Sequence, residues 1–141
     1  MSSYKYYAGG IYLRKVYVRN GWQRFHTMNA QYQYGRFANE YHVGHYQERY
    51  DFISYATPIC HAFYDSFNNH WNISINRAYF DCSSSTSKQF NRWLRENHIP
   101  TDLYELKRLD RCKEFENHTN IDTRDNVTIY WHDSESIERM F

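Results

Sequence analysis

Histidine and cysteine side chains in the middle of the chain are the first candidates for chemistry, because both residue types bind zinc. The candidates are His42, His45, Cys60, His61 and Cys82. Zinc ribbons and zinc fingers hold their metal with closely spaced ligand pairs in a recurring pattern. These residues do not follow that pattern. We therefore interpret them as surface histidines and reduced thiols, and we expect no metal and no other cofactor.

Two catalytic arrangements are conceivable in the middle of the chain. A cysteine such as Cys60 can act as a nucleophile and a histidine such as His61 as its base. Adjacent residues on a strand point to opposite faces, however, so these two side chains cannot pair there. Asp51, Asp65 and Asp81 lie near predicted strand ends, as the carboxylates of a metal-dependent nuclease would. Their spacing matches no recognisable site. The sequence thus predicts a protein that is not an enzyme, with a small metal-dependent nuclease as an alternative.

The first 39 residues form a basic and aromatic segment. It contains six basic and ten aromatic side chains, and no acidic residue precedes Glu40, whereas the remaining 102 residues hold 11 basic and 16 acidic groups. Basic groups attract phosphate, and aromatic rings stack on bases. We predict that the partner-binding residues lie here: Tyr12, Arg14, Lys15, Tyr17, Arg19, Trp22, Arg24 and Arg36.

Turn signals predict a β-hairpin inside this segment. Asn20-Gly21 is the strongest short hairpin signal in the chain, so residues 11–18 and 22–28 are predicted to pair. Residues 29–50 contain two glycines and are read as irregular or as an edge strand.

Three further strands are predicted downstream. Residues 52–65 read as one strand, at an edge or bulged at Pro58, which lacks a backbone donor. Residues 71–80 and 127–132 alternate apolar and polar side chains, which is typical of half-buried strands.

Two helices are predicted between those last strands. The serines of residues 83–87 supply N-caps for a helix that runs to Asn97, with apolar residues on one stripe. Thr101 is predicted to cap the next helix, and residues 117–126 are read as a loop. The predicted core comprises Trp71, Ile73, Ile75, Phe90, Trp93, Leu94, Leu103, Leu106, Ile129 and Trp131.

The order of these elements favours an α+β fold: an antiparallel sheet with an N-terminal β-hairpin and two helices packed on one face. We predict a single domain over residues 1–141, made of a basic aromatic hairpin region (1–50), an α+β core (51–132) and an acidic tail (133–141).

The composition indicates the cellular compartment of the protein. No apolar run is long enough to span a bilayer, and three widely spaced cysteines argue for reduced thiols in a cytosol. We expect a cytoplasmic protein of the host cell, without a membrane partner.

Residues 54–94 resemble a small uncharacterised domain of phage and mobile-element proteins. The resemblance is carried by Ser54-Tyr55-Ala56-Thr57-Pro58 and, after a second strand, by Ser83-Ser84-Ser85-Thr86-Ser87-Lys88 with Phe90, Trp93 and Leu94. It implies that the first strand pairs with a second and that a Ser/Thr-rich turn opens a short helix. It also implies a phage-type accessory role without catalytic residues. Pro58 and the basic aromatic segment depart from the pattern.

Two functions from different classes follow. The first is a non-catalytic inhibitor of a host defence nuclease, similar to an anti-CRISPR protein. It would bind a Cas nuclease or its guide-RNA complex stoichiometrically. The second is a nucleic-acid-binding accessory or regulatory protein that contacts DNA or RNA directly through the hairpin. The acidic remainder of the chain and the total charge of +1 favour the first.

Overall fold

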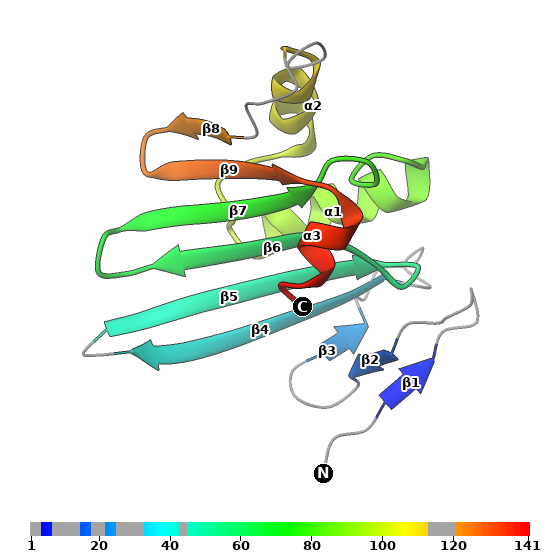
Figure 1. Cartoon of the computed structure of the whole chain (residues 1–141), viewed down its shortest axis with the longest axis horizontal. Coiled ribbons are helices and arrows are strands. Elements are labelled where there is room, and N and C mark those ends of the chain that lie inside the picture. The colour runs from blue at the N-terminus through cyan, green and yellow to red at the C-terminus, as the bar shows by residue number, and fades with distance from the viewer. Residues whose placement is uncertain (1–3, 7–14, 18–21, 25–32, 43–44, 113–120) are drawn as a thin grey trace.

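The computed structural model of the chain describes residues 4–6, 15–17, 22–24, 33–42, 45–112 and 121–141. Figure 1 shows the elements in these ranges. They are β1 (Tyr4–Tyr6), β2 (Lys15–Tyr17), β3 (Trp22–Arg24), β4 (Gln33–His42), β5 (His45–Ser54), β6 (Thr57–Asp65), β7 (His70–Asn76), α1 (Ser84–Glu96), α2 (Leu103–Cys112), β8 (Ile121–Arg124), β9 (Val127–His132) and α3 (Ser134–Glu138).

A seven-stranded sheet in the order β3-β4-β5-β6-β7-β9-β8 organises the molecule, and β1 and β2 form a separate two-stranded sheet. Neighbouring strands are antiparallel except β7 and β9, which are parallel. A parallel pair needs a long crossover, and the segment with α1, α2 and β8 provides it. The predicted α+β class is therefore confirmed.

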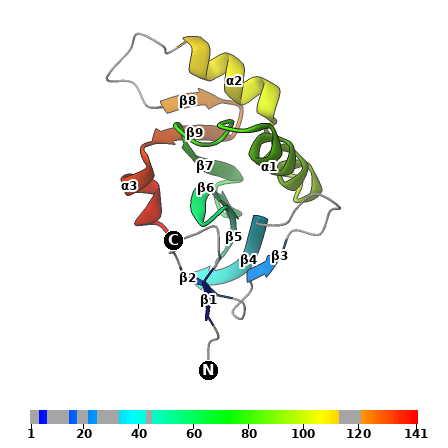
Figure 2. The same ribbon diagram turned by 90° about the vertical axis from the view of Figure 1, so that its right-hand side faces the viewer.

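Helices lie on both faces of the sheet, which corrects the expectation of one covered face. Figure 2 shows α1 on one side of the sheet and α3 on the other. The predicted acidic tail contains α3, whose N-cap Asp133 accepts a hydrogen bond from the Ser136 backbone N–H. Ile137 is fully buried against the sheet. One apolar residue and one cap thus anchor a helix in a segment with weak apolar periodicity.

Helix α1 begins where the serine run predicted. Ser83 is its N-cap and accepts from the Thr86 backbone N–H. Phe90 and Trp93 pack on Phe52 of β5, with ring centroids 5.8 and 5.2 Å away. Gly35 lies under Trp93, and a Cβ at this position would come within 2.9 Å of the indole Nε1. The glycine in β4 therefore marks close packing of the helix on the sheet.

The predicted core is confirmed, because every one of its residues is buried or packs partly buried against the main hydrophobic cluster. That cluster also contains residues that the sequence analysis left out: Phe52, Ile59, Cys60, Ala62, Phe80, Ile99 and Val127.

The predicted strand over residues 52–65 is in fact the end of β5 (residues 52–54), a tight turn and β6. Tyr55 and Ala56 form the turn with φ of 51° and 64°. Neither is a residue type that favours positive φ, so the turn carries no sequence signal. The register shifts beyond Ile53, which pairs with Pro58, while Phe52 pairs with Cys60. Ile59 is the extra residue, so the bulge lies one residue after the predicted position Pro58, and β6 is an inner strand rather than an edge strand.

Five other expectations differ from the structure. The strand predicted over residues 71–80 ends at Asn76, and turns follow it. Residues 33–42 and 45–54 form a long hairpin inside the sheet rather than irregular chain. A hairpin between residues 11–18 and 22–28 was expected. Instead, Lys15–Tyr17 pairs with β1, and Trp22–Arg24 pairs with β4. Asn20-Gly21 lies outside the described residues. Residues 121–124 form β8 within the predicted loop. Asp102, not Thr101, caps α2 and accepts from the Glu105 backbone N–H at 2.8 Å.

Candidate functional site

The outer surface of α1 carries three exposed cations. Lys88, Arg92 and Arg95 are spaced four and three residues apart, so they form one stripe about 10 Å long. The opposite side of the helix packs Phe90, Trp93 and Leu94 into the core, which fixes the cations outward. Within the described residues, none of the three side chains forms an ion pair or a hydrogen bond. Their full charge is therefore available to a partner.

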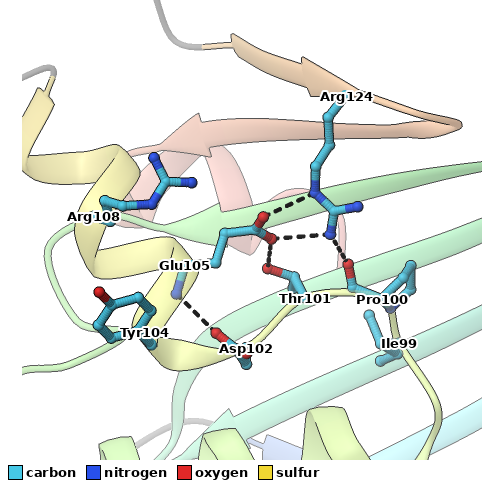
Figure 3. Close-up of a pocket in the computed structure, with 8 residues that line it drawn as sticks. All are labelled: Ile99, Pro100, Thr101, Asp102, Tyr104, Glu105, Arg108 and Arg124. Atoms are coloured by element: carbon cyan, nitrogen blue, oxygen red, sulfur yellow. Dashed lines mark hydrogen bonds and ion pairs between the residues drawn. The ribbon is translucent and has the colours of Figure 1, made fainter.

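A hollow at the junction of α1 and α2 adjoins this stripe. One part, shown in Figure 3, is lined by Tyr104, Arg108 and Arg124. The other part is lined by Tyr104, Arg95 and His98. The Tyr104 side chain lies between them and is 74% exposed, so one ring face is available for stacking.

Asp102 and Glu105 both line this hollow, and the carboxylate of Glu105 is neutralised. Arg124 donates to Glu105 through Nε at 2.9 Å and through Nη2 at 3.0 Å, and Thr101 donates at 2.6 Å. Burial alone would raise the pKa of Glu105, but Arg124 and Thr101 outweigh it and hold the pKa below its ordinary value. The ionised Glu105 thus holds Arg124 of β8 against α2, while Arg95 and Arg108 form no ion pair within the described residues. We name Lys88, Arg92, Arg95, Tyr104 and Arg108 the helical cation face.

Only some of the residues predicted to bind a partner belong to the part of the chain that the structure describes. Tyr12, Arg14 and Arg19 lie outside the described residues. Lys15 and Tyr17 belong to β2, and Trp22 and Arg24 to β3. That these residues form one contact surface stays a prediction.

Arg36 is the one predicted contact residue whose side chain is described, and it points to a buried carboxylate. Asp51 of β5 is fully buried, and its Oδ2 accepts from Arg36 Nε at 2.9 Å and Nη2 at 2.6 Å. On the other side, Asp51 Oδ1 lies 2.5 Å from Nδ1 of His61. Arg49 Nη2 lies 3.6 Å from Oδ2. Arg36 is thus held in the structure by an internal ion pair.

Sequence reasoning missed the Asp51–His61 pair because it depends on the bulge. A regular two-residue turn at Tyr55-Ala56 would pair Asp51 with Cys60 and turn His61 into the core. The extra residue Ile59 brings Asp51 opposite His61 on the face that carries α3. The proline at position 58 was the available signal.

The cysteine and histidine residues considered as catalytic or metal-binding groups do not form a common site within the described residues. Cys60 is fully buried, and burial followed by the charge of Asp51 raises the pKa of its thiol, so the thiolate is disfavoured. Cys60 lies in the core while His61 lies on the opposite face, as strand geometry requires. His42 and His45 are register partners at the end of a hairpin. No group of three metal-ligating side chains gathers within the described ranges.

The β5–β6 turn and the serine run that opens α1 are in contact. The hydroxyl of Ser54, just before the turn, lies 2.9 Å from that of Thr86 in α1, and the hydroxyl of Tyr55 lies 3.3 Å from that of Ser85. These bonds tie the β5–β6 turn to the first turn of α1.

No helix in the described part of the chain is long and apolar enough to cross a membrane. Compared with known protein families, curated proteins and solved structures, the chain shows no match, so its own residues carry the functional argument.

Proposed function

We propose that the protein is a non-catalytic, stoichiometric nucleic-acid-binding protein that contacts the phosphate backbone with the helical cation face. The observation that carries the proposal is the stripe of Lys88, Arg92 and Arg95, three exposed cations without an ion-pair partner in the described residues, beside the exposed ring of Tyr104. Cations that track a backbone next to an aromatic platform are the usual elements of single-strand binding.

The distribution of acidic groups supports this choice over a purely protein-directed inhibitor. The acidic remainder of the chain weighed against direct nucleic-acid binding in the sequence. In the structure, however, Asp51, Glu105 and Asp110 are each paired with an arginine. Their negative charge is compensated locally, which leaves Glu96 on α1 and Asp102 in the hollow as exposed carboxylates beside the helical cations.

An inhibitor of a host defence nuclease, similar to an anti-CRISPR protein, remains the second candidate. Such a protein would use the same cations on the guide RNA of a Cas nuclease complex, and the basic N-terminal segment would add contacts. The phage-type origin implied by the resemblance over residues 54–94 supports this candidate.

Fluorescence anisotropy with single-stranded RNA, single-stranded DNA and duplex DNA tests the proposal. About four phosphate contacts on a single strand give a slope of about −2.8 for log K against log salt, a loss of about fifty-fold in affinity between 50 and 200 mM salt. Replacing Lys88, Arg92 and Arg95 together with Ala removes three contacts and should reduce the magnitude of the slope by about 2.

A matched control separates local contacts from total charge. Arg92→Ala and Arg139→Ala remove the same charge, but Arg139 is the C-cap of α3, which Figure 2 shows on the other side of the sheet from α1. Arg139 is 70% exposed and pairs with Glu135. Arg92→Ala should weaken binding and Arg139→Ala should leave it nearly unchanged. Equal effects of both variants, or an unchanged slope in the folded triple variant, would refute the proposed surface.

A further inference from the structure

The cation stripe of α1 ends at the hollow between α1 and α2. Arg95 is the last cation of the stripe, and it also lines the part of the hollow that lies beside Asn91, Asp102 and Tyr104. This part has a volume of about 530 Å³, within the range of small-ligand pockets. A single strand whose phosphates follow the stripe therefore brings a base to this part of the hollow.

Asp102 presents a fixed hydrogen-bond acceptor to the hollow. Its Oδ1 accepts from the Glu105 backbone N–H at 2.8 Å, as Figure 3 shows, and this cap of α2 holds the carboxylate in place. Oδ2 has no hydrogen-bond partner within the described residues, and Oδ1 keeps a second lone pair. An ionised carboxylate only accepts hydrogen bonds, so Asp102 favours a ligand with adjacent N–H donors.

Asn91 and Arg95 present hydrogen-bond donors to the same hollow. They are four residues apart on α1, so their side chains are neighbours on one side of the helix. Asn91 Oδ1 accepts from the Leu103 backbone N–H at 2.9 Å, which leaves the two N–H groups of Nδ2 as its donors. In the part of the chain that the structure describes, neither Nδ2 nor the Arg95 guanidinium has a partner. The hollow thus combines a fixed acceptor with unengaged donors.

Tyr104 supplies an aromatic surface next to these polar groups. It follows Asp102 by two residues, lines both parts of the hollow and is 74% exposed. An exposed ring stacks on any base, because every base has a π-face. Stacking on Tyr104 therefore gives affinity for a base, and the hydrogen-bonding groups beside the ring decide which base binds.

We propose that this hollow binds a guanine base of a single-stranded nucleic acid, stacked on Tyr104 with its N1–H and N2–H donated to Asp102. This inference rests on the proposed function and names the base that the surface selects. Guanine alone among the four bases has two adjacent donors on its Watson–Crick edge, and its acceptors O6 and N7 follow on the same side, for donation by Asn91 and Arg95. Adenine and cytosine turn a ring-nitrogen lone pair toward the carboxylate, and uracil flanks its one N–H with two carbonyl oxygens.

Fluorescence anisotropy with short labelled uridine strands that carry one central guanosine, inosine or adenosine tests this preference. The guanosine strand should bind about tenfold more tightly than the adenosine strand, and the inosine strand, which lacks the N2 amino group, should lie between them. Asp102→Asn should abolish the preference, because Asn keeps the capping oxygen but replaces the unengaged acceptor with a donor. Since this variant also loses a negative charge, a plain uridine strand should bind it at least as tightly as wild type, whereas a misfolded variant would bind every strand more weakly.

Asp133→Asn is the matched control for Asp102→Asn. Asp133 is also a helix N-cap and accepts from the Ser136 backbone N–H at 2.8 Å, but it caps α3 on the other side of the sheet. The control variant loses the same charge and should keep the guanosine preference. Tyr104→Ala, at an exposed position, should weaken the guanosine strand about tenfold through lost stacking, and Tyr104→Phe should not.

The outcomes separate this inference from the proposed function. Salt-dependent binding with equal affinity for guanosine and adenosine strands overturns the inference and leaves the proposed function in place, and a preference that persists in Asp102→Asn also overturns the inference. Absence of binding to every strand overturns both proposals. The same series in DNA identifies the source of the base: a guanine preference in RNA, in DNA or in both supports the inference.

Discussion

Replacing Asp51 tests how much the buried ion pairs of this residue stabilise the protein. Its carboxylate is fully buried and holds Arg36 and His61 from the two neighbouring strands, with Arg49 3.6 Å away. Asp51→Ala removes the buried carboxylate that these side chains share, while the backbone pairing of β5 stays possible.

The magnitude follows from the burial of the partners. Removing one member of a buried ion pair costs about 3–5 kcal/mol. The side chains of Arg36, His61 and Arg49 are 15, 17 and 25% exposed, so water partly solvates the charges that remain. We therefore expect Asp51→Ala to lower the free energy of unfolding by about 3 kcal/mol. Asp51→Asn keeps one oxygen acceptor and should cost about 2 kcal/mol.

Urea denaturation measures both values. With a slope m of about 2 kcal/mol per molar urea, the midpoint of Asp51→Ala should fall by about 1.5 M. Asp110→Asn is the matched control, because Asp110 pairs with Arg77 near the surface, where both side chains are 30% exposed. Such a pair contributes about 0–1 kcal/mol. Equal midpoints for the Asp51 and Asp110 variants would show that the buried network stabilises nothing.

The same network predicts a dependence on pH. Burial would raise the pKa of Asp51, but His61 and Arg36 hold it below its ordinary value. A carboxylate with a depressed folded-state pKa stabilises the protein fully above its unfolded value of about 3.9, and this contribution is lost as pH falls through the folded value. The stability difference between wild type and Asp51→Asn should therefore be constant near neutral pH and shrink below about pH 4. A difference that grows on acidification contradicts this sign.

The packing of α1 on the sheet gives two further predictions. Trp93→Ala should cost about 3–5 kcal/mol, because the ring is 3% exposed and contacts Phe52 and Phe90; a thermal melt that barely moves would contradict this packing. Gly35→Ala should cost about 1–3 kcal/mol, since its Cβ would lie 2.9 Å from Trp93 Nε1. The loss should be smaller in a Trp93→Phe background, as measured by a double-mutant cycle, and additive losses would show that the two residues do not meet.

Local sequence signals predicted the elements whose pattern is continuous. The stripe of Phe90, Trp93 and Leu94 after a serine cap identified α1, and regular alternation identified β9. Residues 33–54 were missed because Gln33 and Asp51 are buried polar residues, which hide the alternation of β4 and β5. Gly35 was read as a break, although it serves a close approach to Trp93.

The candidate sites could not be predicted from the sequence, because they depend on which side chains the fold brings together. The spacing of Lys88, Arg92 and Arg95 is visible in the sequence, but only the fold shows that Glu105 and Asp110 are paired with other arginines. The neighbourhood of His61 depends on strand register, which a single residue changes.

The bulge at Ile59 also separates two parts of the β5–β6 hairpin that can vary independently during evolution. The tip, from Ile53 to Pro58, bonds to the start of α1, whereas the body carries the Asp51–His61 pair. Because Ile59 has no partner in the ladder, losing this one residue leaves Phe52 opposite Cys60 and Asp51 opposite His61. A length change that would exchange the two faces of an ordinary hairpin leaves the Asp51–His61 pair in register here, and its cost is the loss of the buried Ile59 side chain from the core.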